Sequence, residues 1–396
     1  MHNSQTDLQA TQSIIDIFER SKAHSDEALE SLPGIYAVID SNGNILKGNK
    51  NLALFFCVNH ENLLGRNIQQ ILHEEERLLF KSKIENFKSA RVEGFEFKAN
   101  IVTLEGEKLN FLWDLNVLKT DRADLPLLFS LIGRDVTDLT RTTEQKTRMQ
   151  IELNTAKTVQ DSFFQPPTAS FGNSSVSGFY EPANECGGDW WHYCMMKERL
   201  FLWIGDVTGH GVPAALVVSA VNAVVSTISG TKMSPSEALS VLNNAIHSTA
   251  KDQLGMTFFI ASIDLESRVC SYASAAHEPA VLIRQGQTPP TVQDFKMLGI
   301  SPGLPLGVTK NVVFEETKIQ LNQGDRIFLY TDGLRDLFNS LGKNRQSLRF
   351  YKELANLASK YQSPLDLAHG FQNKLNEVRG GAPLQDDVTF LVFKLG

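Results

Sequence analysis

The stretch Phe201–Leu216, FLWIGDVTGHGVPAAL, decides how the C-terminal half of the chain folds. An apolar run ends on Asp206, two glycines flank His210, and an alanine-rich apolar segment follows. This pattern predicts a buried strand, a tight corner and then a helix. Loops at the ends of such elements are where functional side chains are usually placed. We therefore expect the strand to deliver the carboxylate of Asp206 to a functional site.

Three further acidic segments share this design: GGDWW at 187–191, IFLYTDGLRD at 327–336 and LQDDVTFLVF at 384–393. Asp189, Asp332, Asp386 and Asp387 each stand close to an apolar run, and strand ends hold side chains with little freedom. Nearby glycines let backbone carbonyls approach closely. One Asp-Gly pair alone predicts only a turn. Four such segments together predict a pocket in which these aspartates meet Asp206.

The residue types in this pocket indicate its chemistry. Aspartates that converge without a cysteine or histidine cluster form an all-oxygen site, which favours Mg²⁺ or Mn²⁺ over Zn²⁺ or copper. Two such ions bridged by a carboxylate lower the pKa of a shared water and hold a phosphoryl group in line for attack. The sequence has no Walker lysine motif and no convincing Ser-His-Asp or Cys-His arrangement. We therefore expect hydrolysis by a metal-activated water, with two Mn²⁺ or Mg²⁺ ions as cofactors.

Length, charge and cysteine usage limit the class of protein. With 396 residues, two or three domains are expected. The net charge of −7 argues against a nucleic-acid or anionic-membrane partner. Four scattered cysteines and no signal-peptide pattern suit a reducing cytoplasm, where we place the protein. Val212–Ile228 carries no charge but is short for a membrane span, so we expect a buried core helix there.

The N-terminal part, residues 32–137, alternates short apolar runs with helical patterns. GIYAVIDSNGNILKGN has a hairpin signal at Asn42-Gly43, and three strand-like runs close the region. This order resembles a PAS domain, a family of small-ligand sensors and dimerisation modules. Flavin-photosensing members keep a reactive cysteine where this chain has Ile68, which argues against blue-light chemistry. His60 and His73 are candidate haem ligands, although surface histidines are the commoner reading, so the PAS ligand stays unknown.

Residues 138–168 form a polar and charged connection that we interpret as a linker helix. Met149, Leu153, Ala156, Gln160 and Phe163 follow one another at spacings of 4, 3, 4 and 3, close to a heptad seam. The pattern predicts either a solvated helix or, as we favour, a parallel coiled coil that joins two protomers into a homodimer. Pro166 and Pro167 are expected to end the helix. Residues 1–31, with Ile14, Ile15 and Phe18, are expected to form a helical extension.

Residues 169–396 carry a specific set of motifs. In order they are GGDWWHY, GDVTGHGVPAAL, MTFFIASIDLESRVCSYASAAHEPAVLIR, SPGLPLGV, GDRIFLYTDGLRD and DDVTFLVFKL. This set resembles bacterial serine phosphatases of the SpoIIE/RsbU type, a branch of the metal-dependent protein phosphatase 2C (PPM) superfamily. Together with the PAS-like region, the chain resembles the PAS-containing phosphatases of partner-switching pathways. The fold class implied is α+β, with an N-terminal PAS domain, a coiled-coil linker and a C-terminal PPM-type α-β-β-α sandwich.

The resemblance also implies roles for the acidic residues. Asp206 should bridge both metal ions, with the Val207 carbonyl as a further ligand. Asp332 and Asp386 should bind metal directly, and Asp189 directly or through water. Asp387 stands where relatives carry Asn or Asp and is counted among the metal-site residues. The four catalytic residues expected are therefore Asp189, Asp206, Asp332 and Asp386. The glycines of the motifs, Gly187, Gly188, Gly205 and Gly209, should shape the backbone around the ions.

The histidines of the motifs are expected to be structural rather than catalytic. His210 should help to shape the corner after Asp206. Relatives commonly show Ala-Gly-His where this chain has Ala275-Ala276-His277, so the extra methyl of Ala276 bears on the shape of that loop.

The function expected is removal of phosphate from serine or threonine of a partner protein. The resemblance implies a phosphorylated anti-sigma-factor antagonist of STAS type as that partner, with activity set by the PAS domain and linker. The alternative is a non-catalytic signalling scaffold with a degenerate phosphatase fold, against which the retention of every expected carboxylate argues. A diguanylate cyclase is disfavoured because Trp190 and Trp191 follow the Gly-Gly-Asp sequence.

Overall fold

The computed structural model describes residues 25–89, 94–118, 127–250, 254–286, 289–300, 303–339 and 348–396. Within it the chain separates into two compact units, residues 1–148 and 149–396. Residues 25–30 are helical, whereas Ile14, Ile15 and Phe18 of the expected N-terminal extension lie outside the described residues.

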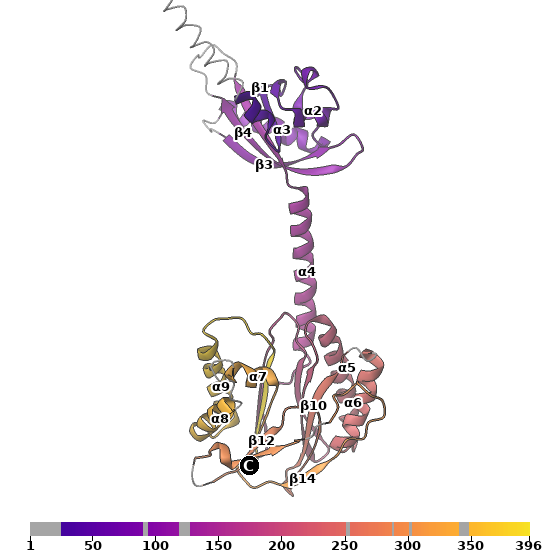
Figure 1. The fold of residues 1–396 in the computed structure, drawn as a ribbon, viewed down its shortest axis with the longest axis vertical. Helices are drawn as coiled ribbons and strands as arrows, with labels where there is room; N and C mark the ends of the chain where they lie inside the picture. Colours follow the sequence, from indigo (N-terminus) through magenta and orange to yellow (C-terminus); the bar gives the residue numbers. More distant parts are fainter. Residues whose placement is uncertain are drawn as a thin grey trace, which may run out of the picture. The chain divides into compact units, whose positions relative to one another are not determined.

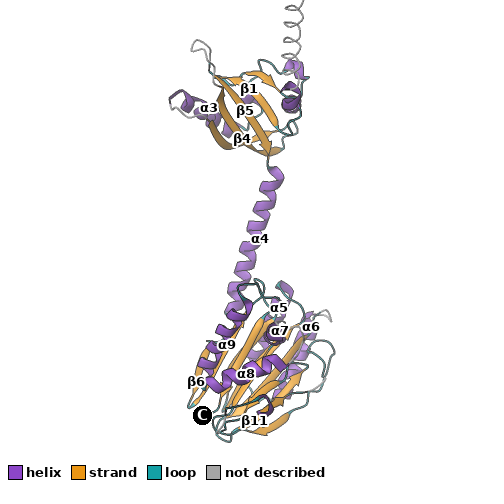
Figure 2. Cartoon of the chain, turned by 60° about the vertical axis from the view of Figure 1, so that its left-hand side comes forward, coloured by secondary structure: helices purple, strands orange, loops and turns teal. Residues whose placement is uncertain are grey.

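The first unit is built around a five-stranded antiparallel sheet with the strand order β2-β1-β5-β4-β3 (Figure 2). Short helices connect the hairpin β1–β2 to the remaining strands, as the PAS resemblance implies (Figure 1). The elements are β1 (Ile35–Asp40), β2 (Ile45–Gly48), α2 (Lys50–Phe56), η1 (His60–Asn62), η2 (Ile68–Gln70), α3 (Glu74–Ser89), β3 (Gly94–Val102), β4 (Lys108–Leu118) and β5 (Leu128–Asp135).

The hairpin predicted at Asn42-Gly43 is confirmed. Gly43 has a φ of +86°, and Asp40 Oδ1 accepts the backbone N–H groups of Asn42 and Asn44 at 2.8 Å each. Side chains along β1 alternate between buried and half-buried positions, so one face of the strand packs into the core of this unit. Ile68 is fully buried in that core. The side chain of His60 contacts the carbonyl oxygen of Gly48.

The predicted linker is a helix, α4 (Thr137–Asp161), which crosses the boundary between the two units. Part of its expected seam is directed differently from the prediction. Met149 is 63% exposed, but Gln160 is only 3% exposed and bonds to Gly187 of the same chain. Phe163 packs against the core of the second unit. The C-terminal end of the seam therefore packs against its own domain. The heptad pattern could not predict this, because it indicates that one side of a helix is covered but not which surface covers it.

The second unit contains two antiparallel sheets. One has the strand order β14-β11-β10-β9-β8 and the other the order β13-β12-β15-β16-β7-β6. Their strands are β6 (Thr168–Phe171), β7 (Ser174–Glu181), β8 (Asp189–Met196), β9 (Arg199–Val207), β10 (Met256–Asp264), β11 (Val269–Ala275), β12 (Ala280–Ile283), β13 (Phe295–Leu298), β14 (Thr317–Gln320), β15 (Arg326–Tyr330) and β16 (Val388–Lys394). A short helix, η3 (Val292–Asp294), precedes β13.

The two sheets pack face to face, and helices cover their outer faces (Figure 2). Side chains such as Leu202 and Ile204 of β9 meet Leu329 and Leu391 of the other sheet in one buried cluster. Helices α5 (Val212–Ile228) and α6 (Pro235–Ala250) pack on the outer face of the β9 sheet. Helices α7 (Asp332–Asn339), α8 (Leu348–Lys360) and α9 (Pro364–Arg379) pack on the outer face of the β16 sheet. The α-β-β-α sandwich is thus present.

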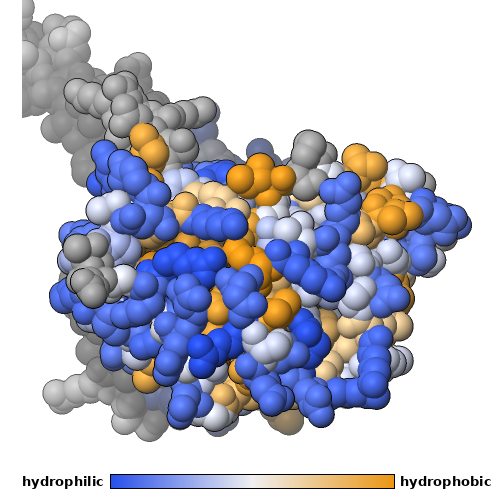
Figure 3. All heavy atoms as spheres, turned by 90° about the horizontal axis from the view of Figure 1, so that it is seen from below, coloured by the Kyte–Doolittle hydropathy of each residue, from blue (hydrophilic) through white to orange (hydrophobic). Residues whose placement is uncertain are grey.

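The apolar segment after Asp206 is the buried helix that its composition predicts. Ala214, Val217, Val218, Val221 and Val225 of α5 are buried against the β9 sheet. In the part of the chain that the structure describes, no helix is long and apolar enough to cross a bilayer. On the face shown in Figure 3, apolar groups lie in separate patches among hydrophilic side chains.

Ala276 adopts a backbone conformation that favours glycine, with a φ of +54°. For a residue with a Cβ this region costs about 1 kcal/mol. We therefore expect Ala276→Gly to raise the free energy of unfolding by up to about 1 kcal/mol, which is about 2–4 °C in Tm for a domain of this size. Ala275→Gly, one residue earlier inside β11, should lower the Tm, because glycine weakens a strand. Equal effects of the two changes in thermal unfolding would contradict this interpretation.

Candidate active site

Two of the predicted aspartates face each other across neighbouring strands. Asp189 begins β8, Asp206 lies one residue before the end of β9, and the two residues are direct partners in the antiparallel register. Directly opposed residues have Cβ atoms about 4.5–5.5 Å apart, where like charges are destabilising. The pairing of β8 with β9 thus places two carboxylates side by side at one end of the sheet, in spite of their mutual repulsion.

The other two aspartates come from the second sheet. Asp332 is the first residue of α7 and follows the end of β15 by two residues, and Asp386 precedes the start of β16 by two residues. Strands β15 and β16 are antiparallel neighbours, with Tyr330 opposite Phe390, so the end of one lies beside the start of the other. Antiparallel pairing, which also places Asp189 beside Asp206, therefore brings Asp332 and Asp386 to the same end of the second sheet.

The pKa values indicate that the two pairs share one region. Burial, followed by the charges of Asp332 and Asp386, raises the pKa of Asp206 to about 8. Asp189 is only 1% exposed, and burial together with Asp206 and Asp387 raises the pKa of its carboxyl well above the usual range. Burial also raises the pKa of Asp386, with a further contribution from Asp332. In the described ranges, no group of three or more Asp, Glu, His or Cys side chains is spaced as the ligands of a single ion.

Asp387 holds the backbone that carries Asp189. Its Oδ1 accepts the N–H of Ala183 at 2.8 Å, and its Oδ2 accepts the N–H groups of Gly188 at 2.6 Å and of Asp189 at 3.4 Å. Both carboxylate oxygens are therefore engaged with the segment 183–189. This anchoring role was not expected from the sequence, and the place of Asp387 among the metal ligands stays a prediction.

Backbone oxygens also lie close to this region. A Cβ atom on Gly188 would lie 3.1 Å from the carbonyl oxygens of Val207 and Gly209, which is tighter than an ordinary van der Waals contact, so glycine favours this approach. Carboxylates and carbonyl oxygens together form the donor set that hard divalent cations prefer. The types of donor present thus fit Mg²⁺ or Mn²⁺, and the place of Val207 among the metal ligands stays a prediction.

Thr331 is a further residue of this region that the sequence analysis did not single out. Its buried hydroxyl donates to Asp189 Oδ2 at 2.8 Å and accepts the N–H of Thr389 at 3.2 Å. Thr331 thereby orients Asp189 from the opposite sheet. The only signal in the sequence is a polar residue at the end of the apolar run IFLYT.

The two histidines of the motifs lie in different surroundings. His210 is exposed in the corner between β9 and α5. His277 is buried, and its Nδ1 lies 2.8 Å from the hydroxyl oxygen of Thr257, the strand partner of Asp206. Burial lowers the pKa of His277 to about 3, so this imidazole is neutral. The contact of His277 is compatible with a structural role, and the role of His210 stays a prediction.

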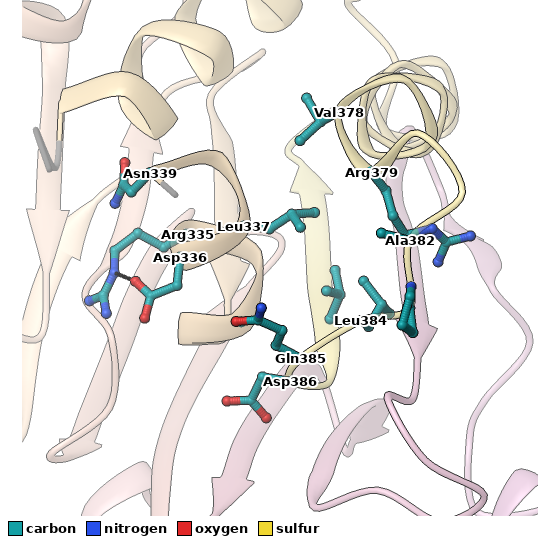
Figure 4. A pocket seen from close by; sticks show the side chains of 13 residues that line it. Arg335, Asp336, Leu337, Asn339, Val378, Arg379, Ala382, Leu384, Gln385 and Asp386 are labelled. Carbon is teal, nitrogen blue, oxygen red and sulfur yellow. Dashed lines mark hydrogen bonds and ion pairs between the residues drawn. The ribbon is translucent and has the colours of Figure 1, made fainter. Parts of the chain in front are cut away.

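A cavity of about 850 Å³ opens beside Asp386. Figure 4 shows α7, with Arg335 and Asp336, on one side of it and Arg379 on the other. Arg335 forms ion pairs with Glu278 and, at 2.9 Å, with Asp336, while Arg379 pairs with Glu181. The wall between them is largely apolar and includes Leu337, Val378, Ala382, Pro383 and Leu384. The cavity is therefore lined by apolar side chains, by two arginines that already form ion pairs, and by Asp386.

Comparison with known proteins identifies both units. Residues 196–396 match the family model described as Stage II sporulation protein E (SpoIIE), and residues 23–136 match the PAS fold. The phosphoserine phosphatase RsbU of Bacillus subtilis (strain 168) is 28% identical over 193 residues, which cover 49% of this chain and 55% of RsbU. The phosphoserine phosphatase RsbP of the same organism is 24% identical over 190 residues, covering 47% of this chain and 45% of RsbP.

These curated relatives are therefore matched over only about half of their own length. Among solved structures, the PP2C domain of SiaA from Pseudomonas aeruginosa aligns with a TM-score of 0.52 and 19% identity. The alignment covers 64% of this chain and 99% of that domain. At this identity the likeness concerns the fold alone, which is that of a PP2C domain.

Proposed function

Because the chain belongs to the SpoIIE family, we propose that it is a metal-dependent protein phosphatase acting on phosphoserine or phosphothreonine of a partner protein. The observation that carries this proposal is the shared electrostatic region of Asp189, Asp206, Asp332 and Asp386, which come from both sheets. Neighbouring carboxylates whose charges raise one another's pKa are typical of functional sites. In a non-catalytic scaffold this repulsion would lower the stability of the fold without a compensating function.

In this proposal the four aspartates, with the Val207 carbonyl, hold two Mn²⁺ or Mg²⁺ ions. The ions would supply positive charge for the phosphoryl group and an activated water. The protein's own part is to fix the ligands. Thr331 and the backbone bound by Asp387 hold Asp189, while the register of β9 with β8 and β10 holds Asp206. Rigid placement of this kind is what a functional carboxylate needs.

The substrate we propose is a phosphorylated anti-sigma-factor antagonist of STAS type, which the resemblance to partner-switching phosphatases implies. The segment around its phosphorylated residue would lie in the cavity beside Asp386, between Arg335 and Arg379. The PAS domain would set the activity through α4.

The proposal is tested by measuring phosphate release from a phosphoserine protein and from p-nitrophenyl phosphate. We expect release that requires Mn²⁺ or Mg²⁺ and stops when EDTA is added. A folded, metal-loaded sample without turnover on either substrate would favour the non-catalytic scaffold instead.

We also propose that the protein is a homodimer, joined through the PAS unit and the N-terminal part of the α4 seam. Leu153→Lys would place a charge in that seam, so we expect dimerisation to weaken by about 10-fold or more. Light scattering of the full chain over a concentration series measures the change. Thr155→Lys, at an exposed position of α4 outside the seam, is the matched control. A mass that stays the same for Leu153→Lys at every concentration would argue against this interface.

A further inference from the structure

Gln160 is a buried amide at the end of a largely exposed helix. It lies one residue before the end of α4 and is only 3% exposed. Its Nε2 donates to the carbonyl oxygen of Gly187 at 2.8 Å, and its Oε1 accepts the N–H of the same residue at 3.2 Å. A buried side-chain amide is costly unless its polar atoms are paired, and here a single backbone residue pairs both ends.

Gly187 is held from its other side as well. A Cβ atom at this position would lie 2.3 Å from Asp387 Oδ2 and 2.3 Å from the hydroxyl oxygen of Tyr180, so a larger residue would displace one or both of these side chains. The next two backbone N–H groups, of Gly188 and Asp189, donate to Asp387. The backbone that leads into Asp189 is therefore clamped between Gln160 on α4 and Asp387 before β16.

The end of α4 has a fixed place in this domain. Phe164 stacks on Tyr180 with the ring centroids 4.4 Å apart, and it lies 5.9 Å from the ring of Trp191. The hydroxyl of Tyr193 donates to the carbonyl oxygen of Pro166 at 2.7 Å. These contacts join the residues after the helix to strands β7 and β8, so the amide of Gln160 presents a rigid partner to Gly187.

We infer that Gln160 is a positioning residue for the metal-binding segment: its amide holds the Gly187 peptide and thereby the carboxylate of Asp189. This inference rests on the proposed function, since it assigns Asp189 to a metal. Without Gln160, the N–H and carbonyl of Gly187 lose their partners, while Asp387 still binds the next two N–H groups. The backbone around Gly187 then opens more readily, and the carboxylate of Asp189 is held less firmly.

The test compares Gln160→Met with Gln150→Met. Methionine keeps the length of the side chain and removes both hydrogen bonds. Gln150 lies on the same helix and is exposed, and among the described residues its amide donates to the side chains of Asn154 at 3.3 Å and of Glu185 at 3.4 Å. Amide hydrogen exchange of Gly187 and Gly188, which Gln150 does not contact, is measured in metal-free protein, and Mn²⁺ affinity is measured by calorimetry.

For Gln160→Met we expect exchange at Gly187 and Gly188 to be about 10-fold faster and Mn²⁺ affinity about 10-fold weaker, with neither changed in Gln150→Met. At saturating Mn²⁺, kcat should stay within about threefold of wild type, because a positioning residue acts on metal retention. Exchange and affinity within twofold of the Gln150→Met control would overturn the inference. If Gln160→Met does not unfold cooperatively, Gln160→Glu, which keeps the acceptor for Gly187 N–H but loses the donor, is compared by the same criteria.

These measurements separate the inference from the proposed function. Hydrogen exchange requires neither turnover nor metal, so it reports on Gln160 even if the wild-type protein releases no phosphate. Absence of turnover with the exchange difference intact would remove the phosphatase proposal and leave the clamp on Gly187 in place. Turnover by the wild-type protein with unchanged exchange in Gln160→Met would support the phosphatase proposal and remove the clamp on Gly187.

Discussion

Asp206→Ala is expected to lower the rate of phosphate release by about 10³-fold or more, because the proposed metal-bridging carboxylate is lost and several kcal/mol of charge stabilisation go with it. The fold should remain intact. Asp206 is a half-buried carboxylate whose pKa is raised by desolvation and by the charges of Asp332 and Asp386, so its removal relieves repulsion. Thermal unfolding of the metal-free variant should therefore occur at or above the wild-type Tm.

The matched control for this prediction is Asp264→Ala. Asp264 ends β10, at the end opposite to the Asp206 pair, and accepts the N–H groups of Glu266 and Ser267. Its removal should lower stability slightly and leave phosphate release unchanged. A rate near that of the wild type for Asp206→Ala would refute the site assignment, whatever the stability of the variant.

Asp387→Ala is expected to have the largest effect on stability, about 3 kcal/mol or more. It removes the acceptor of three backbone N–H groups, those of Ala183, Gly188 and Asp189, and a buried donor without a partner costs about 1–3 kcal/mol. Denaturant-induced unfolding of the metal-free protein measures this loss. Asp387→Asn retains one carbonyl acceptor, so it should fall between the wild type and the alanine variant.

The neighbouring residue provides the contrast. Asp386 accepts the N–H of Asp387 at 2.9 Å, and we propose it as a metal ligand. We expect Asp386→Ala to abolish phosphate release while changing the free energy of unfolding by less than about 1 kcal/mol. The two adjacent aspartates would then have different roles: Asp386 would act in phosphate release, and Asp387 would stabilise the backbone. Equal stability losses in Asp386→Ala and Asp387→Ala would contradict this division.

Much of the fold could be predicted from local patterns. The helix expected at Val212–Ile228 has those bounds, and the hairpin at Asn42-Gly43 forms where the turn residues indicate it. The SpoIIE and PAS resemblances are confirmed by the family models. Such features depend on residues close together in the chain, whose periodicity and turn preferences act before any tertiary contact forms.

The partners of individual side chains could not be predicted in this way. The heptad-like spacing through Gln160 indicated that one side of α4 is covered, but the covering surface is its own domain at Gly187. The hydrogen bond between Thr331 and Asp189 spans 142 residues, and that between Asp387 and Gly188 spans 199. No local pattern contains these separations.

By itself, the sequence determined the strands, helices and turns, and which aspartates stand at strand ends. The packing of the two sheets decided the rest: that Asp189 is held by Thr331 and Asp387, and that a linker glutamine reaches its backbone. The physical reason is that burial and periodicity select which face of an element is covered. The hydrogen-bond partners on that face are selected only when the sheets and helices have met.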